Sequence, residues 1–405
     1  MGISFLLLFA CFIGGAEQVY ARGNGIQAGP GRLHPSIDLS LVFDTNPSYS
    51  SNNAFSDLIL QMRPGLTLEF PSDTVSFELN SKVGYDYYFG VENSNSTNLS
   101  TIAGEADLKL GFNPNGQFSF FIEDVFSRSG DPRYSAVSGR FDRTNNEAKA
   151  HFQFKPGGGA LMFDLAYGFF IDWFDDSGVN AQALSSYGHR IYFSGKWKFL
   201  PKTAVTIDFD SDIRRYPNGY DNGTKNIDIN AIRATAGMIG QISPSLSLVI
   251  KAGYGDTLLD APTGYTGSDF RSAIGQAEVN FQVGTMLLQG GYLRNFQPAP
   301  LYAYFGQDRF YLRYRQLLAG RFTLSAHVGF DLLDYGTGVQ ADAGERFDFL
   351  LTGGASFEYH ILDWLALGLD YRLQALFSDY AQPLAGAGGV EYSKHAFGFR
   401  VSLDY

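Results

Sequence analysis

Charged residues that recur at every second position are the first candidates for a chemical role in this sequence. One row is acidic, and another is basic with a tyrosine inside it: Asp208, Asp210 and Asp212, and Arg309, Tyr311, Arg313 and Arg315. Because successive side chains of a β-strand point to opposite faces, each row lies on a single face of a strand. Acidic and basic rows on different parts of one wall would set up an electric field across the space they enclose. We predict that these residues shape the passage of solutes; the alternative is that they are solvated wall charges joined in mutual ion pairs.

Apolar residues beside the charged rows follow the same alternation. The clearest row is Leu161, Phe163, Leu165, Tyr167, Phe169, Ile171 and Trp173. A helix would distribute these side chains around its circumference, whereas a strand places them on one face. About eighteen such segments occur between residues 33 and 405. Further polar residues that this alternation places on the inner face are Arg190, Lys196, Lys198, Gln276, Glu278, Asn280 and Gln282.

The connections between these segments alternate between short and long. The short ones are tight turns rich in Pro or Gly, such as 71–73, 113–116 and 156–159. The long ones are polar loops, and the longest, 128–141 and 377–391, are the candidates for a gate folded into a lumen. In transmembrane barrels the short turns face the periplasm and the long loops face outside.

Composition agrees with a large membrane barrel. The 405 residues include 36 Phe, 24 Tyr and 47 Gly, while only 18 % are charged. Beyond residue 21 no run approaches the roughly 20 apolar residues that a membrane helix requires. The sequence therefore predicts an all-β, transmembrane, antiparallel up-and-down β-barrel of about eighteen strands, with short periplasmic turns and longer extracellular loops.

The N-terminus resembles a secretory leader. Residues 3–15 are almost wholly apolar, and Val19-Tyr20-Ala21 presents small residues where a signal peptidase cleaves. We expect residues 1–21 to be a signal peptide, 22–32 a short Gly-rich periplasmic lead-in, and 33–405 the barrel. A retained membrane anchor is the alternative for the leader.

Residue patterns for catalysis or metal binding are sparse. The six histidines are scattered without ligand spacing, and Cys11, the one cysteine, lies inside the leader. The net charge of -11 argues against a nucleic-acid partner, since phosphate binding needs concentrated Lys and Arg. We predict no enzymatic activity, no metal site and no cofactor.

The C-terminus carries a specific resemblance. Its alternating apolar residues are Phe397, Phe399, Val401, Leu403 and the terminal Tyr405. This pattern resembles the terminal strand that the outer-membrane barrel-assembly machinery recognises, although Phe is the more usual last residue. The resemblance implies insertion into the outer-membrane lipid of a Gram-negative bacterium.

The start of the barrel is similar to that of an outer-membrane β-barrel porin family. His34-Pro35-Ser36-Ile37, followed by Phe43-Asp44-Thr45-Asn46, matches a proline-containing first strand that runs into a loop. The family includes large barrels thought to export exopolysaccharide. The resemblance implies a channel for saccharides or polysaccharide, with saccharide or polysaccharide export components as partners. The alternative is a loop-mediated adhesin or a structural barrel with a closed lumen.

Overall fold

The computed structural model of the chain describes residues 23–130, 140–175, 181–219, 225–261, 265, 267–299, 301–338, 345–380 and 390–405. These residues form one sheet of twenty strands. Two of the strands are short additions, β1 (Ile26–Ala28) and β13 (Leu259–Asp260). Among the described residues, no helix is long and apolar enough to cross a membrane.

The remaining strands form the wall. They are β2 (Gly31–Asp44), β3 (Asp57–Phe70), β4 (Val75–Tyr88), β5 (Thr101–Phe112), β6 (Phe118–Ser129), β7 (Arg143–Phe154), β8 (Leu161–Phe174), β9 (Ser186–Leu200), β10 (Thr203–Arg215), β11 (Asp228–Ser243), β12 (Leu246–Asp256), β14 (Arg271–Val283), β15 (Met286–Ala299), β16 (Tyr302–Leu318), β17 (Phe322–Tyr335), β18 (Phe347–Leu362), β19 (Leu365–Ser378) and β20 (Tyr392–Asp404). Short 3-10 helices lie in three connections: η1 (Ser94–Leu99), η2 (Pro156–Gly159) and η3 (Ala181–Leu184).

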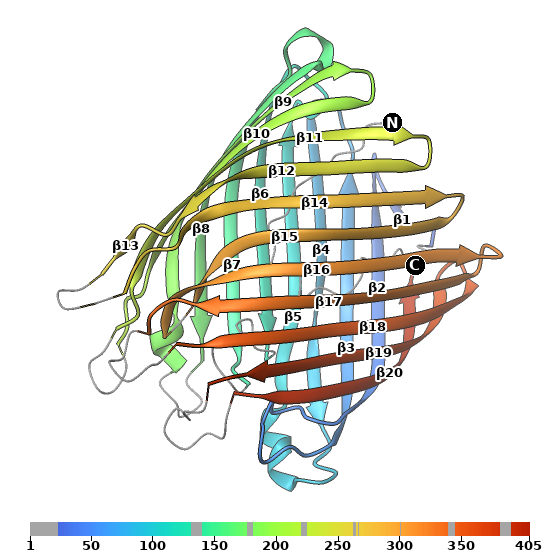
Figure 1. Cartoon of the computed structure of the whole chain (residues 1–405). Helices are drawn as coiled ribbons and strands as arrows, with labels where there is room; N and C mark the ends of the chain where they lie inside the picture. Colours follow the sequence, from blue (N-terminus) through green and yellow to red (C-terminus); the bar gives the residue numbers. More distant parts are fainter. Residues whose placement is uncertain are drawn as a thin grey trace.

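The wall closes on itself. Each long strand pairs antiparallel with its neighbours along the chain, and β2 pairs with β20 from Ser36 opposite Asp404 to Asp44 opposite Ala396. Closure joins the first wall strand to the last, so the wall that the described residues form has no edge strand, as a sheet within lipid requires. The strands surround one lumen, and β1 and the C-terminus lie at the end that carries the short turns (Figure 1). The predicted barrel of about eighteen antiparallel strands is confirmed.

The two faces of the wall differ in polarity as the alternation predicts. Along β8 the outward residues are exposed, including Leu165 at 52 %, while the residues between them are mostly buried. Aromatic residues stand on the outside near both ends, for example Phe112 and Phe199 beside short turns and Tyr87 and Trp173 beside long loops. So much exposed apolar surface would not be stable in water, so the exterior is built for lipid.

The first described residues and the C-terminus meet at the short-turn end. β1 pairs with the start of β2, and Gly23 donates its backbone N–H to the Asp404 carbonyl oxygen at 2.9 Å. The His34 Nδ1 lies 3.1 Å from the Tyr405 backbone oxygen. The first wall strand begins at Gly31, within the predicted lead-in, and the predicted signal peptide lies outside the described residues. The predicted assembly signal forms β20, with Phe397, Phe399 and Tyr405 exposed on the exterior; its recognition stays a prediction.

A charge on this exterior should weaken the barrel. Leu165 lies near the middle of β8 on the lipid face, so we expect Leu165→Arg to lower the free energy of unfolding by about 2–4 kcal/mol. Gln153→Arg, on the lumen face of β7, should change it by less than about 0.5 kcal/mol. Urea-dependent refolding into lipid vesicles measures both, and equal effects would contradict the assigned faces.

Candidate functional site

The lumen is the candidate functional site, because the inward residues are mostly polar or charged. A cavity of about 1820 Å³ lies inside the wall, lined mainly by the inner faces of β2–β12. Asp38, Arg63, Lys82, Glu123 and Asp208 are among the residues lining it. No group of three or more His, Cys, Asp or Glu residues suited to a metal ion occurs in the part of the chain that the structure describes.

The predicted acidic row faces this cavity, and each of its carboxylates has a cationic partner. Asp208 accepts from Lys251 Nζ at 2.8 Å, Asp210 from Arg233 Nη1 at 2.9 Å, and Asp212 from Arg190 Nη2 at 3.3 Å. The partners come from other strands rather than from the predicted basic row. Because these cations offset the carboxylates, the row contributes less to a field across the lumen, and its role in ion selectivity stays a prediction.

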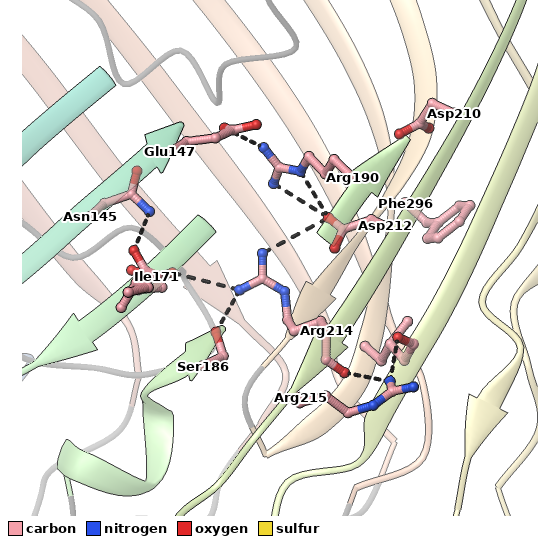
Figure 2. A network of polar contacts seen from close by, with 12 residues as sticks. Asn145, Glu147, Ile171, Ser186, Arg190, Asp210, Asp212, Arg214, Arg215 and Phe296 are labelled. Atoms are coloured by element: carbon pink, nitrogen blue, oxygen red, sulfur yellow. Dashed lines mark hydrogen bonds and ion pairs between the residues drawn. The ribbon is translucent and has the colours of Figure 1, made fainter. Parts of the chain in front are cut away.

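Asp212 belongs to a longer network on β7–β10. Figure 2 shows the guanidinium groups of Arg190 and Arg214 turned toward it, with Glu147 on the far side of Arg190. Arg214 is buried and stacks on the ring of Phe170 at 4.4 Å, while Arg190 stacks on the same ring at 4.8 Å. This network fixes the arginines against the wall, where Arg190 lines the cavity and Arg214 is buried.

The predicted basic row faces the lumen on β16. Arg309 pairs with Asp331 at 2.5 Å, and Arg313 donates to Gln289 at 3.2 Å while lying 5.2 Å from the ring centre of Tyr311. The Tyr311 hydroxyl donates to Glu278 at 2.5 Å. Arg315 faces Leu287 and Ser325 on the neighbouring strands and has no carboxylate partner among the described residues. The placement of the row on the inner face agrees with the alternation; its part in selecting ions stays a prediction.

Beyond Arg294 on β15, the β15–β16 hairpin leaves the wall and enters the lumen. Pairing between β14 and β15 stops at Gly275 opposite Arg294, although both strands continue beyond that point. Arg233 lies on β11, which β12 and β14 separate from β15. It donates from Nε to the Asn295 side chain at 3.1 Å and from Nη2 to the Phe296 carbonyl oxygen at 3.0 Å. Its guanidinium also lies 4.1 Å from the centre of the Phe296 ring. Arg233 therefore fastens the hairpin to the wall that carries Asp210.

The tip of the hairpin reaches the connections on the other side of the barrel mouth. Leu301 donates its backbone N–H to Asn226 at 2.9 Å, and Asn226 donates in turn to the Ala183 carbonyl oxygen at 2.8 Å. One apolar cluster joins the hairpin to β8, η3 and neighbouring loops: Phe141, Phe174, Ala181, Leu184, Ala299, Leu301, Tyr302, Phe305, Leu333 and Tyr335. Five wall strands separate β8 from β15, so these contacts cross the mouth and narrow it.

Backbone strain accompanies this contact. Leu301 has a φ of 71°, a left-handed conformation that a residue with a Cβ seldom adopts. The packing of its side chain, only 7 % exposed, holds the residue there.

The alternation of residues along the strands does not identify this hairpin as the narrowing element. The predicted gate loops, 128–141 and 377–391, lie largely outside the described residues. One signal was present: the connection near residue 300 carries Pro298, Leu301 and Tyr302, whereas other long loops are rich in Gly, Asn and Ser.

Two patches of unlike charge face the same lumen below the hairpin. On β4 and β5, the carboxylates of Glu78, Glu105 and Asp107 have no cation within salt-bridge distance among the described residues. Further along the wall, between the end of β7 and the start of β10 near the short turns, lie four lysines that line the cavity: Lys155, Lys196, Lys198 and Lys202. These patches, rather than the predicted acidic row, present unpaired charge to the cavity. The alternation placed Lys196 and Lys198 inward, but the pattern could not show which charges are paired.

Comparison with known proteins gives similarity at the level of fold. No family model matches the sequence, and no curated protein matches it. The chain is similar to OccAB4 of Acinetobacter baumannii, with a TM-score of 0.51, 10 % identity, and coverage of 94 % of this chain and 99 % of that one. It is also similar to the outer membrane protein OpdK of Pseudomonas aeruginosa, with a TM-score of 0.50, 9 % identity, and coverage of 92 % and 99 %. The chain shares the closed-barrel fold of outer-membrane porins, and its apolar exterior places it in the outer membrane.

Proposed function

We propose that this chain is a diffusion channel for small polar solutes, with a lumen narrowed by the β15–β16 hairpin. The observation that carries the proposal is the charged cavity of about 1820 Å³ inside the wall, which the hairpin narrows but does not fill. An apolar or fully packed interior would favour a structural barrel, whereas ionic side chains need water beside them. The fold shared with outer-membrane porins supports the same reading.

The passage of saccharides or polysaccharide is a finer hypothesis. Sugars bind to aromatic faces and to hydrogen-bonding groups, and the inward Tyr192 and Tyr311 offer both. The inward hairpin narrows the mouth, so it favours small sugars over a polymer chain. Slower ion flow in the presence of oligosaccharides of increasing length would support this hypothesis.

Planar bilayers test the channel itself. Purified protein, shown to be folded by its heat-dependent migration on gels, should give stepwise conductance. Folded protein that inserts without conducting would contradict the proposal and favour the adhesin or closed-barrel alternative.

The unpaired carboxylates should influence ion selectivity. We expect the triple variant Glu78→Gln, Glu105→Gln, Asp107→Asn to lower the permeability of K⁺ relative to Cl⁻ several-fold, because the lumen loses three negative charges without freeing any lysine. Reversal potentials across a KCl gradient measure the change. The variant Glu78→Asp, Glu105→Asp, Asp107→Glu keeps the charges and should keep the parent selectivity; an unchanged value in the neutral variant would contradict the prediction.

A further inference from the structure

We propose that Lys155, Lys196, Lys198 and Lys202 form a binding site for multiply charged oxyanions, such as phosphate groups, at the short-turn end of the lumen. All four line the cavity described above. The inference rests on the proposed channel function, and it adds a binding site for one class of solute inside that channel.

Strand register places the four side chains together. Met162 on β8 pairs with Lys196, and Lys155 lies one step past the Phe154–Phe163 pair, so Lys155 is level with Met162. Neighbouring strands are about 4.8 Å apart, which puts the backbones of Lys155 and Lys196 about 10 Å apart on one level. Lys198 is two residues further along β9, about 7 Å closer to the turn that contains Lys202. Flexible lysine side chains can converge on one ion over such spacings.

The nearest carboxylates are engaged elsewhere. Asp164 accepts from Gln153 at 3.3 Å and lies 3.4 Å from His151 Nδ1. Asp208 accepts from Lys251 at 2.8 Å and from Ser194 at 2.7 Å. Within the described part of the chain, none of the four lysines of the cluster lies within salt-bridge distance of a carboxylate.

Other lysines of the same cavity behave differently. Lys82, Lys109, Lys149 and Lys251 are each paired, with Asp38, Glu123, Glu147 and Asp208 respectively, at 2.7 to 3.5 Å. The wall carboxylates therefore neutralise the ammonium groups of these four paired lysines. The ammonium groups of the four-lysine cluster remain available to bind a solute. Ammonium groups donate charge-assisted hydrogen bonds to oxyanions, and several cations in one place favour an anion with more than one charge.

Phosphate block of the open channel tests the site. We expect millimolar inorganic phosphate to reduce the chloride current through the full-length protein in planar bilayers. The test variant is Lys155→Gln, Lys196→Gln, Lys198→Gln, Lys202→Gln. Its half-blocking phosphate concentration should be at least about tenfold higher than that of the parent, because the charge-assisted contacts are lost.

The matched control removes the same number of charges from paired cations of the cavity and leaves the Lys251–Asp208 pair intact: Arg63→Gln, Lys82→Gln, Lys109→Gln, Lys149→Gln. It should keep a half-blocking concentration closer to that of the parent. Equal losses in the two quadruple variants would overturn the site, because net lumen charge alone would then explain the block. The single variant Lys196→Gln, with a smaller effect in the same direction, serves if the quadruple variant does not fold.

Phosphate binding to the detergent-solubilised protein, followed by the ³¹P line width, separates the two proposals. One result is that the parent protein binds phosphate without conducting, while the four-lysine variant fails to bind it. That result would contradict the channel and support the site. A conducting protein with neither phosphate block nor phosphate binding would keep the channel and overturn the site.

Discussion

Arg233→Ala should raise the single-channel conductance and make it fluctuate between levels. In the parent, the Arg233 guanidinium joins Asp210 of the wall to Asn295 and Phe296 of the hairpin. Two charge-assisted hydrogen bonds and a ring contact hold the hairpin in the lumen, and each hydrogen bond is worth about 1.5–3 kcal/mol. Losing at least about 3 kcal/mol would shift the hairpin more than a hundredfold toward positions nearer the wall.

Two further variants make this prediction specific. Arg233→Lys keeps the charge beside Asp210 but loses the fork that reaches both hairpin groups, so its conductance should lie between those of Arg233→Ala and the parent. Leu301→Gly relieves the positive φ but removes the apolar contact at the tip, and it should also raise the conductance. Recordings of folded Arg233→Ala that match the parent would show that the hairpin does not limit ion flow.

Arg346→Met should cause the largest loss of stability of any single change near the mouth. Arg346 and Asp348 are both almost fully buried and pair at 2.6 Å, and Ser378 Oγ also donates to Asp348 at 2.6 Å. Burial alone would lower the pKa of Arg346, but the neighbouring Tyr335 and the hydrogen bond to Asp348 raise the pKa above its usual value. Without the guanidinium, the Asp348 carboxylate would remain buried with a hydroxyl as its main partner. We expect a loss of about 3–5 kcal/mol.

A double variant separates the ion pair from simple packing. Arg346→Met with Asp348→Leu removes both charges and should recover most of the lost stability, because no buried charge is left alone. The Arg346 guanidinium lies 4.4 Å from the centre of the Tyr335 ring, so a part of the loss should remain in the double variant. Thermal unfolding in detergent measures both variants. Equal instability of the single and double variants would contradict the assigned role of the ion pair.

The barrel and the direction of its side chains follow from the sequence alone. Alternation is a local property of a strand, so Leu165 could be assigned to lipid and Asp208 to the lumen without any knowledge of pairing. The Pro- and Gly-rich turns then mark where the strands end, and the number of strands follows from the number of these segments. The same local rule placed Arg309 and Lys196 on the inner face.

Only the tertiary structure decided which charges are paired and what narrows the lumen. Asp208 meets Lys251, 43 residues along the chain, because of the register of three neighbouring strands. Arg233 meets Asn295 because a hairpin leaves its place in the wall, which no alternation in either strand records. These contacts depend on the three-dimensional closure of the ring, whereas a period of two residues reports only which face of a strand each side chain occupies.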